Sequence, residues 1–82
     1  MQTFQLAAIQ MNAPLGKVER NRATVLAWAE RAARAGAQFA LFPELVISGH
    51  WCSGEVRAAA EPVPDGPTVQ ALIEAARDLD LV

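Results

Sequence analysis

The chain has 82 residues, of which 52% are hydrophobic and 20% are charged, and its formal net charge is -2 at pH 7. This length allows one small domain at most, and the hydrophobic share excludes a disordered segment. The charge balance argues against a nucleic-acid surface and a polybasic membrane patch, and no apolar run is long enough to span a bilayer. A single cysteine, Cys52, excludes an internal disulfide framework, and the N-terminus lacks the basic region of a signal peptide. We therefore expect a cytoplasmic protein that binds neither nucleic acid nor membrane.

Two apolar segments flank a helical pattern in the first half of the chain. Phe4–Ile9 and Gln38–Phe42 are apolar nearly throughout, which is typical of strands covered on both faces. Between them, apolar and small residues recur at steps of three and four from Val18 to Gly36, which predicts a helix. Gly36 is expected to end this helix, because glycine adopts a left-handed backbone conformation without a Cβ clash. A strand, a helix and a strand with short connections predict a right-handed βαβ unit with parallel neighbouring strands.

The second half of the chain contains a loop, room for a short helix, and the clearest helical pattern. Gly49 and Gly54 indicate a compact loop, and a short helix fits within Glu55–Glu61. Pro67 suits the first position of the next helix. The apolar residues of that helix recur at helical spacing and predict a buried face: Val69, Leu72, Ile73, Ala76 and Leu79. Asp80–Val82 is expected to open a third strand.

Glu44 is the residue that this pattern singles out. Pro43 keeps Phe42 extended and ends the second strand, so Glu44 stands at, or just past, the carboxyl end of a buried strand. Ligands of open α/β sheets bind at that edge. Apolar neighbours in the sequence favour desolvation of the carboxyl group, which would raise its pKa and make it a better base. The pattern alone also allows an ordinary carboxylate that caps the next turn or lies at the surface.

Four segments occur in an informative order: Leu6–Met11, Gly36–Glu44, Val46–His50, and the lead-in Glu61–Thr68 with the helix that follows it. Together they resemble the N-terminal portion of the carbon–nitrogen hydrolase (nitrilase) superfamily. The resemblance implies an α/β fold, the βαβα(β) start of a nitrilase-type αββα sandwich. Residues 1–82 would then be the incomplete N-terminal part of a single domain, truncated after the second helix. The resemblance also implies a homo-oligomer in the full-length form.

The superfamily hydrolyses non-peptide carbon–nitrogen bonds with a Glu-Lys-Cys triad and without a cofactor or metal. The resemblance therefore implies a small-molecule amide or carbamoyl substrate, or less readily a nitrile. Glu44 matches the general base that takes the proton from the cysteine thiol; the thiolate then attacks the substrate carbon, and the lysine stabilises the oxyanion. The family's lysine and cysteine lie beyond Val82, so this chain carries only the glutamate. Lys17 and Cys52 match no triad motif, and Cys52 is expected to be a partly buried, inert thiol.

His50 and Trp51 follow Glu44 closely and are candidate substrate-binding residues, with packing of the loop as the alternative. A lone histidine without Asp, Glu or Cys at ligand spacing does not predict a metal site. Trp28 is expected to lie in the core or an interface. A second function class also stays open: a small non-catalytic α/β module that binds a partner through its open sheet edge. The DNA beyond Val82 separates the two classes, because only the hydrolase needs an in-frame lysine and a cysteine-containing segment there.

Overall fold

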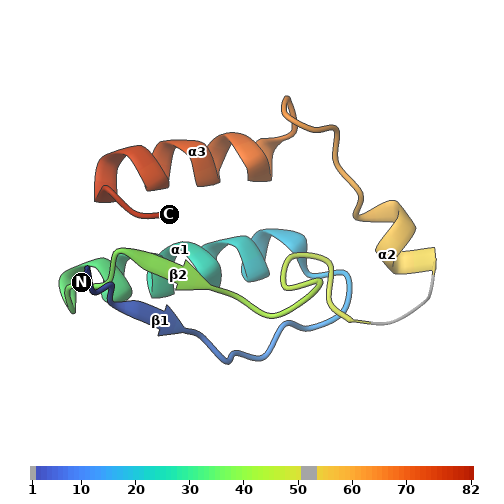
Figure 1. The fold of residues 1–82 in the computed structure, drawn as a ribbon. Helices are drawn as coiled ribbons and strands as arrows, with labels where there is room; N and C mark the ends of the chain where they lie inside the picture. The colour runs from blue at the N-terminus through green and yellow to red at the C-terminus, as the bar shows by residue number, and fades with distance from the viewer. Residues whose placement is uncertain (1, 51–53) are drawn as a thin grey trace.

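The computed structural model describes residues 2–50 and 54–82. Its elements follow in the order β1 (Leu6–Ala8), α1 (Val18–Arg34), β2 (Phe39–Leu41), α2 (Gly54–Ala58) and α3 (Pro67–Leu79). The two strands pair in parallel, as Figure 1 shows, with Leu6 opposite Phe39. The predicted mixed α/β class and the parallel strand–helix–strand unit are confirmed.

Both strands are shorter than the apolar segments that predict them. Pairing continues slightly beyond them, since the Gln38 N–H donates to the Gln5 carbonyl and the Ile9 N–H donates to the Leu41 carbonyl, each at 2.8 Å. Apolar runs therefore mark the strands correctly but overestimate the length of the regular ladder. Past these bonds the two segments separate into the loops that carry the candidate site.

α1 ends where glycine was expected to end it. Gly36 has a φ of 93°, in the left-handed region. Its N–H donates to the Ala33 carbonyl, and the Ala37 N–H donates to the Ala32 carbonyl, both at 3.0 Å. These two bonds form the Schellman arrangement, which satisfies carbonyls left free at a helix end. The short connection from α1 to β2 follows from this ending.

α1 contacts α3, and one side of α1 forms a buried stripe. This stripe consists of Asn21, Val25, Ala29 and Ala32. The apolar members agree with the predicted helical face, whereas the polar residue Asn21 was not expected there. Trp28 is half-buried, and the Arg31 guanidinium lies 4.8 Å from its ring centroid. Trp28 therefore lies at the edge of the core and carries a cation–π contact.

The last residue of the chain pairs with the free edge of β2. The Val82 N–H donates to the Gln38 carbonyl at 3.0 Å, and the Ala40 N–H donates to the Val82 carbonyl at 2.9 Å. This is the bonding pattern of a parallel bridge, and it places Val82 beside Phe39. The expected opening of a third strand is thus present as a single bridging residue.

α3 begins at Pro67, as predicted, but its apolar face is incompletely covered. Leu72 and Ile73 are 37% and 43% exposed, and the buried residue of the helix is Thr68. The prediction of a buried face is therefore wrong for these two side chains and for Ala76, which is also exposed in the described chain. Periodicity identifies which side of a helix is apolar, but it does not supply the surface that covers that side.

One face of the sheet is also open. Side chains alternate along a strand, so Leu6 points to the same face as Phe39 and Leu41. Leu6 and Leu41 are each 60% exposed, and the ring of Phe4 meets that of Phe39 edge to face with 5.4 Å between centroids. The expectation of strands covered on both faces is therefore wrong for the described residues.

Candidate functional site

Glu44 lies at the start of a tight turn immediately after β2. The turn runs over residues 44–48, and Leu45 has a φ of 54°. A left-handed conformation is uncommon for a residue with a side chain as large as leucine. The Gly49 N–H donates to the Leu45 carbonyl at 2.8 Å. The carboxylate is thus carried by a sharp turn just past the carboxyl end of a strand, the position that the sequence predicts.

The Glu44 side chain is more exposed than its apolar neighbours in the sequence suggest. It is 80% exposed, and its Oε2 lies 3.6 Å from Nε2 of His50, which is itself 68% exposed. Leu45, the next residue, is 42% exposed and does not cover the carboxylate. The expected desolvation is therefore absent in the described residues, because the neighbours of Glu44 in the sequence do not cover its carboxylate.

His50 is the predicted site residue that the structure brings to Glu44. An exposed pair at this distance contributes little to stability, since solvent screens the two groups. It does place an imidazole and a carboxylate next to each other at one end of β2. Trp51 and Cys52 lie outside the described residues. Lys17 occupies the N-cap position of α1.

The turn after Glu44 is tied to the loop that follows β1. The Gly16 N–H donates to the Ser48 carbonyl at 2.8 Å. The side-chain amide of Asn21 donates to the Ile47 carbonyl at 2.8 Å and to the Pro14 carbonyl at 2.9 Å. Two loops that follow neighbouring parallel strands are therefore joined by backbone and side-chain bonds.

The buried position and bonds of Asn21 were not predicted from the sequence. A signal was present, because Asn21 lies four residues before Val25 and so falls in step with the apolar stripe of α1. A polar residue at such a position is buried with hydrogen-bonding partners far away in the sequence. Those partners cannot be identified from helical spacing.

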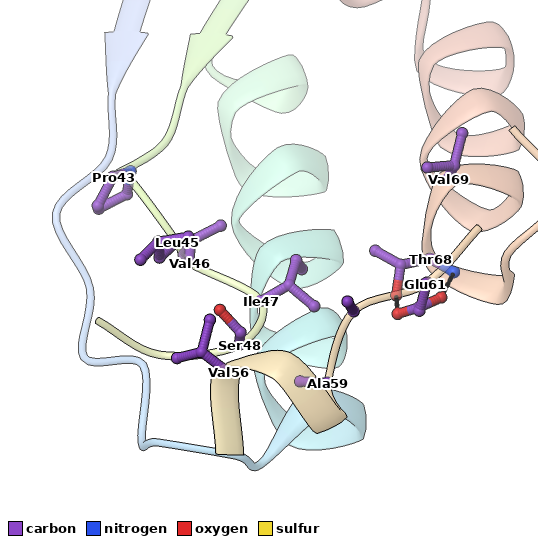
Figure 2. A pocket seen from close by; sticks show the side chains of 11 residues that line it. Pro43, Leu45, Val46, Ile47, Ser48, Val56, Ala59, Glu61, Thr68 and Val69 are labelled. Atoms are coloured by element: carbon purple, nitrogen blue, oxygen red, sulfur yellow. Dashed lines mark hydrogen bonds between the residues drawn. The ribbon is translucent and has the colours of Figure 1, made fainter. Parts of the chain in front are cut away.

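A cavity of about 420 Å³ lies beside the turn (Figure 2). Its lining is mainly apolar and comes from the turn, α2 and α3: Val46, Ile47, Val56 and Val69 among others. Glu61 and Thr68 are polar residues of the lining. The Glu44 side chain is not part of this lining, so the cavity neighbours the candidate base without containing it.

Glu61 caps the start of α3. Its carboxylate accepts the Thr68 N–H at 2.8 Å and the Thr68 hydroxyl at 2.5 Å, as the dashed lines in Figure 2 mark. The N-cap residue, Gly66, has no side chain for this task. A Cβ on Gly66 would lie 2.6 Å from the Pro62 carbonyl oxygen. The segment before α3 thus needs glycine at position 66, and the helix is capped by the side chain of Glu61 instead.

The Thr68 hydroxyl links this cap to α1, because it also accepts a hydrogen bond from Nη1 of Arg22 at 3.1 Å. The pKa of Glu61 is lowered from its ordinary value of 4.5, chiefly by the Thr68 hydroxyl and next by the Thr68 N–H. Burial opposes these effects, and the positive charge of Arg22 adds to them. The ionised form of Glu61 is therefore the one that fits the fold.

We expect the stabilisation from Glu61 to be lost in acid. A carboxyl group with a lowered folded-state pKa stabilises the fold above its unfolded-state pKa, and this is lost as the pH falls through the folded-state pKa. Glu61→Gln removes this titration. Between about pH 6 and about pH 3, wild-type protein should lose more free energy of unfolding than the variant in urea titrations. Equal losses in the two proteins would contradict the assignment.

Within residues 2–50 and 54–82, no cluster of three or more His, Cys, Asp or Glu side chains is arranged to hold a metal ion. In the same ranges no helix has the length and hydrophobicity needed to cross a membrane.

Comparison with protein families finds a match to the carbon-nitrogen hydrolase family. The family model matches residues 5–82. The matched range contains both strands, the turn that carries Glu44, and the capped start of α3. No curated protein matches the chain.

Proposed function

The chain belongs to the carbon-nitrogen hydrolase family. We propose that it acts in an enzyme that hydrolyses amide or carbamoyl groups of small molecules, and nitriles less readily. The observation that carries this proposal is the placement of Glu44. It stands on a sharp, doubly anchored turn just past the carboxyl end of β2, inside the matched range. Ligands of α/β sheets gather at that edge.

Glu44 is the proposed general base of a Glu-Lys-Cys triad. It takes the proton of the cysteine thiol, and the thiolate attacks the carbonyl carbon of the substrate. The amine leaves with a proton returned by Glu44, and water then cleaves the thioester to release the acid. The lysine stabilises the oxyanion that forms at each addition step. Lys17 and Cys52 match no triad motif, so we place the lysine and the cysteine outside residues 1–82.

The exposure of Glu44 fits a site that another part of the enzyme completes. A carboxylate that is 80% exposed is open to an approaching thiol. The segment bearing that thiol would also exclude water, and desolvation would then strengthen Glu44 as a base. His50, whose Nε2 is 3.6 Å from Glu44, and Trp51 are the proposed substrate-binding residues.

The uncovered surfaces support a fold proposal of the same kind. Residues 1–82 would form the N-terminal part of a single domain with an αββα sandwich. The face carrying Leu6 and Leu41 would then pack on a second sheet, which removes apolar surface from water. We further propose a cytoplasmic homo-oligomer.

The test is ammonia release by the protein expressed from its complete reading frame. Three probes separate the substrate classes: propionamide, N-carbamoyl-alanine and propionitrile. We expect turnover of propionamide or N-carbamoyl-alanine to exceed that of propionitrile. Folded protein that releases no ammonia from any probe would overturn the proposal. A reading frame without a further lysine and cysteine would favour the alternative, a non-catalytic α/β module.

A further inference from the structure

We propose that Asn21 is a positioning residue for Glu44. Its side-chain amide holds the turn that begins at Glu44 against the loop that follows β1. Asn21 does not touch the reacting atoms. The inference rests on the proposed role of Glu44 as general base. It adds a residue that orients this base.

The amide of Asn21 bridges two loops from a buried position. Its side chain is 0% exposed on α1. Nδ2 donates to the carbonyl of Ile47, in the turn, and to that of Pro14, in the loop after β1. A side-chain amide nitrogen has two N–H donors, so both are used. One helix therefore fixes the two loops that follow neighbouring strands relative to each other.

The turn needs such support because its backbone is strained. Leu45 has a φ of 54°, a left-handed conformation that is unfavourable for a non-glycine residue. Strain of this kind persists only where surrounding contacts enforce it. The enforcing contacts are the Gly49 bond to Leu45, the Gly16 bond to Ser48, and the Asn21 bond to Ile47.

The hydrogen-bonding amide of Asn21, rather than the size of its side chain, explains why asparagine occupies this position. Neighbouring members of the buried stripe, Val25 and Ala29, are apolar. Oδ1 of Asn21 is buried and has no hydrogen-bond partner among the described residues. Burying an unpaired oxygen is unfavourable, so a residue that only filled the core would be apolar. The two N–H donors are what an apolar residue cannot supply.

The Glu44 carboxylate depends on the backbone for its direction. It is 80% exposed, and its Oε2 lies 3.6 Å from Nε2 of His50, a side chain that is itself exposed. Packing therefore does not fix the carboxylate. Its position is set by β2 on one side and by the anchored turn on the other. Loosening the turn should displace the base, and a displacement of about 1 Å can reduce a rate by about a hundredfold.

The experiment compares Asn21→Leu with Thr24→Ala in the protein from the complete reading frame. Leucine is similar in size to asparagine and has no donor. Thr24 is the matched control, because its hydroxyl binds the Arg20 carbonyl within the same helix and does not contact the turn. With propionamide or N-carbamoyl-alanine, we expect Asn21→Leu to lower kcat by about tenfold to a hundredfold, with KM changed less than about threefold. Thr24→Ala should stay within about twofold of wild type.

A second background separates positioning from loss of structure. In Glu44→Asp the carboxylate is already displaced by one methylene, so Asn21→Leu should cost less than about threefold there. An equal loss in both backgrounds would show that Asn21 does not act through Glu44. Where Asn21→Leu fails to fold, Asn21→Ser, which keeps one shorter donor, carries the same comparison.

Hydrogen exchange tests the anchoring without any need for activity. In the Asn21 variant the amides of Gly16 and Gly49 should exchange at least about tenfold faster, while that of Ala29 in α1 stays protected. Unchanged exchange at both glycines would overturn the inference about Asn21 but not the proposed function. Absence of turnover in wild-type protein would instead overturn the proposed function, and with it the role of Asn21 in positioning a general base.

Discussion

Glu44→Gln should lower kcat by about a hundredfold to ten-thousandfold while the protein stays folded. A general base contributes a factor of this size, and glutamine keeps the shape of glutamate but cannot accept the thiol proton. The Glu44 side chain is 80% exposed and pairs with a histidine at 3.6 Å. Losing such a pair changes stability little, so the melting temperature should shift by only about 1–2 °C. Ammonia release and a thermal melt measure the two quantities.

Glu61→Gln is the matched control for this substitution. Glu61 is a carboxylate in the lining of the cavity beside the turn, and its oxygens accept hydrogen bonds from Thr68 at the start of α3. The same change of charge should therefore lower the free energy of unfolding at neutral pH and leave kcat within about threefold. Turnover that survives Glu44→Gln, or a loss of kcat that follows Glu61 instead, would show that the base has been assigned to the wrong carboxylate.

Local rules of the backbone account for the parts of the fold that the sequence predicts well. The periodicity of α1, the left-handed Gly36 and Pro67 at the first position of α3 each depend on a few adjacent residues. Such residues act through helical spacing and backbone geometry, and both can be inferred from the sequence. The parallel pairing of β1 with β2 follows because a helix connects two apolar segments.

The features that the sequence did not predict all depend on contacts between distant residues. Asn21 meets Ile47 across 26 positions of the chain. The turn that begins at Glu44 contains a positive φ at Leu45, and it is held by bonds from Gly16 and Asn21, which lie far away in the sequence. Leu72 and Ile73 belong to an apolar face whose covering surface is not among the described residues. In each case the residue type indicates a structural role, but the sequence does not identify the residues that it contacts.

For the candidate site, the sequence predicted a position and the structure adds the means of holding it. Phe42-Pro43-Glu44 indicates a carboxylate at a strand end, and the nearness of His50 in sequence proved to be nearness in space. The anchors of the turn lie elsewhere, on α1 and on the loop after β1. The base and the scaffold that orients it therefore come from different parts of the chain.

Gly49→Ala should be among the most destabilising single substitutions in this chain. Gly49 is buried and has a φ of 86°, where an L side chain is strained. A Cβ there would lie 2.5 Å from Cα of Leu15 and 2.9 Å from its nitrogen. Both are backbone atoms, so no side-chain rotation can relieve the clash, and the two loops must separate. Overpacking and backbone strain together should cost about 2–4 kcal/mol.

Gly54→Ala provides the control for Gly49→Ala, because a Cβ at Gly54 would contact no atom of the described residues within 4 Å. Gly54 begins α2, where alanine is a better helix former than glycine, so its replacement should change stability by less than about 1 kcal/mol. Urea unfolding of the protein from the complete reading frame measures both variants. Separation of the loops in Gly49→Ala should also lower kcat, because the Gly49 N–H closes the turn that carries Glu44. If Gly49→Ala unfolds at the same urea concentration as Gly54→Ala and retains its turnover, the close contact with Leu15 does not hold this turn in place.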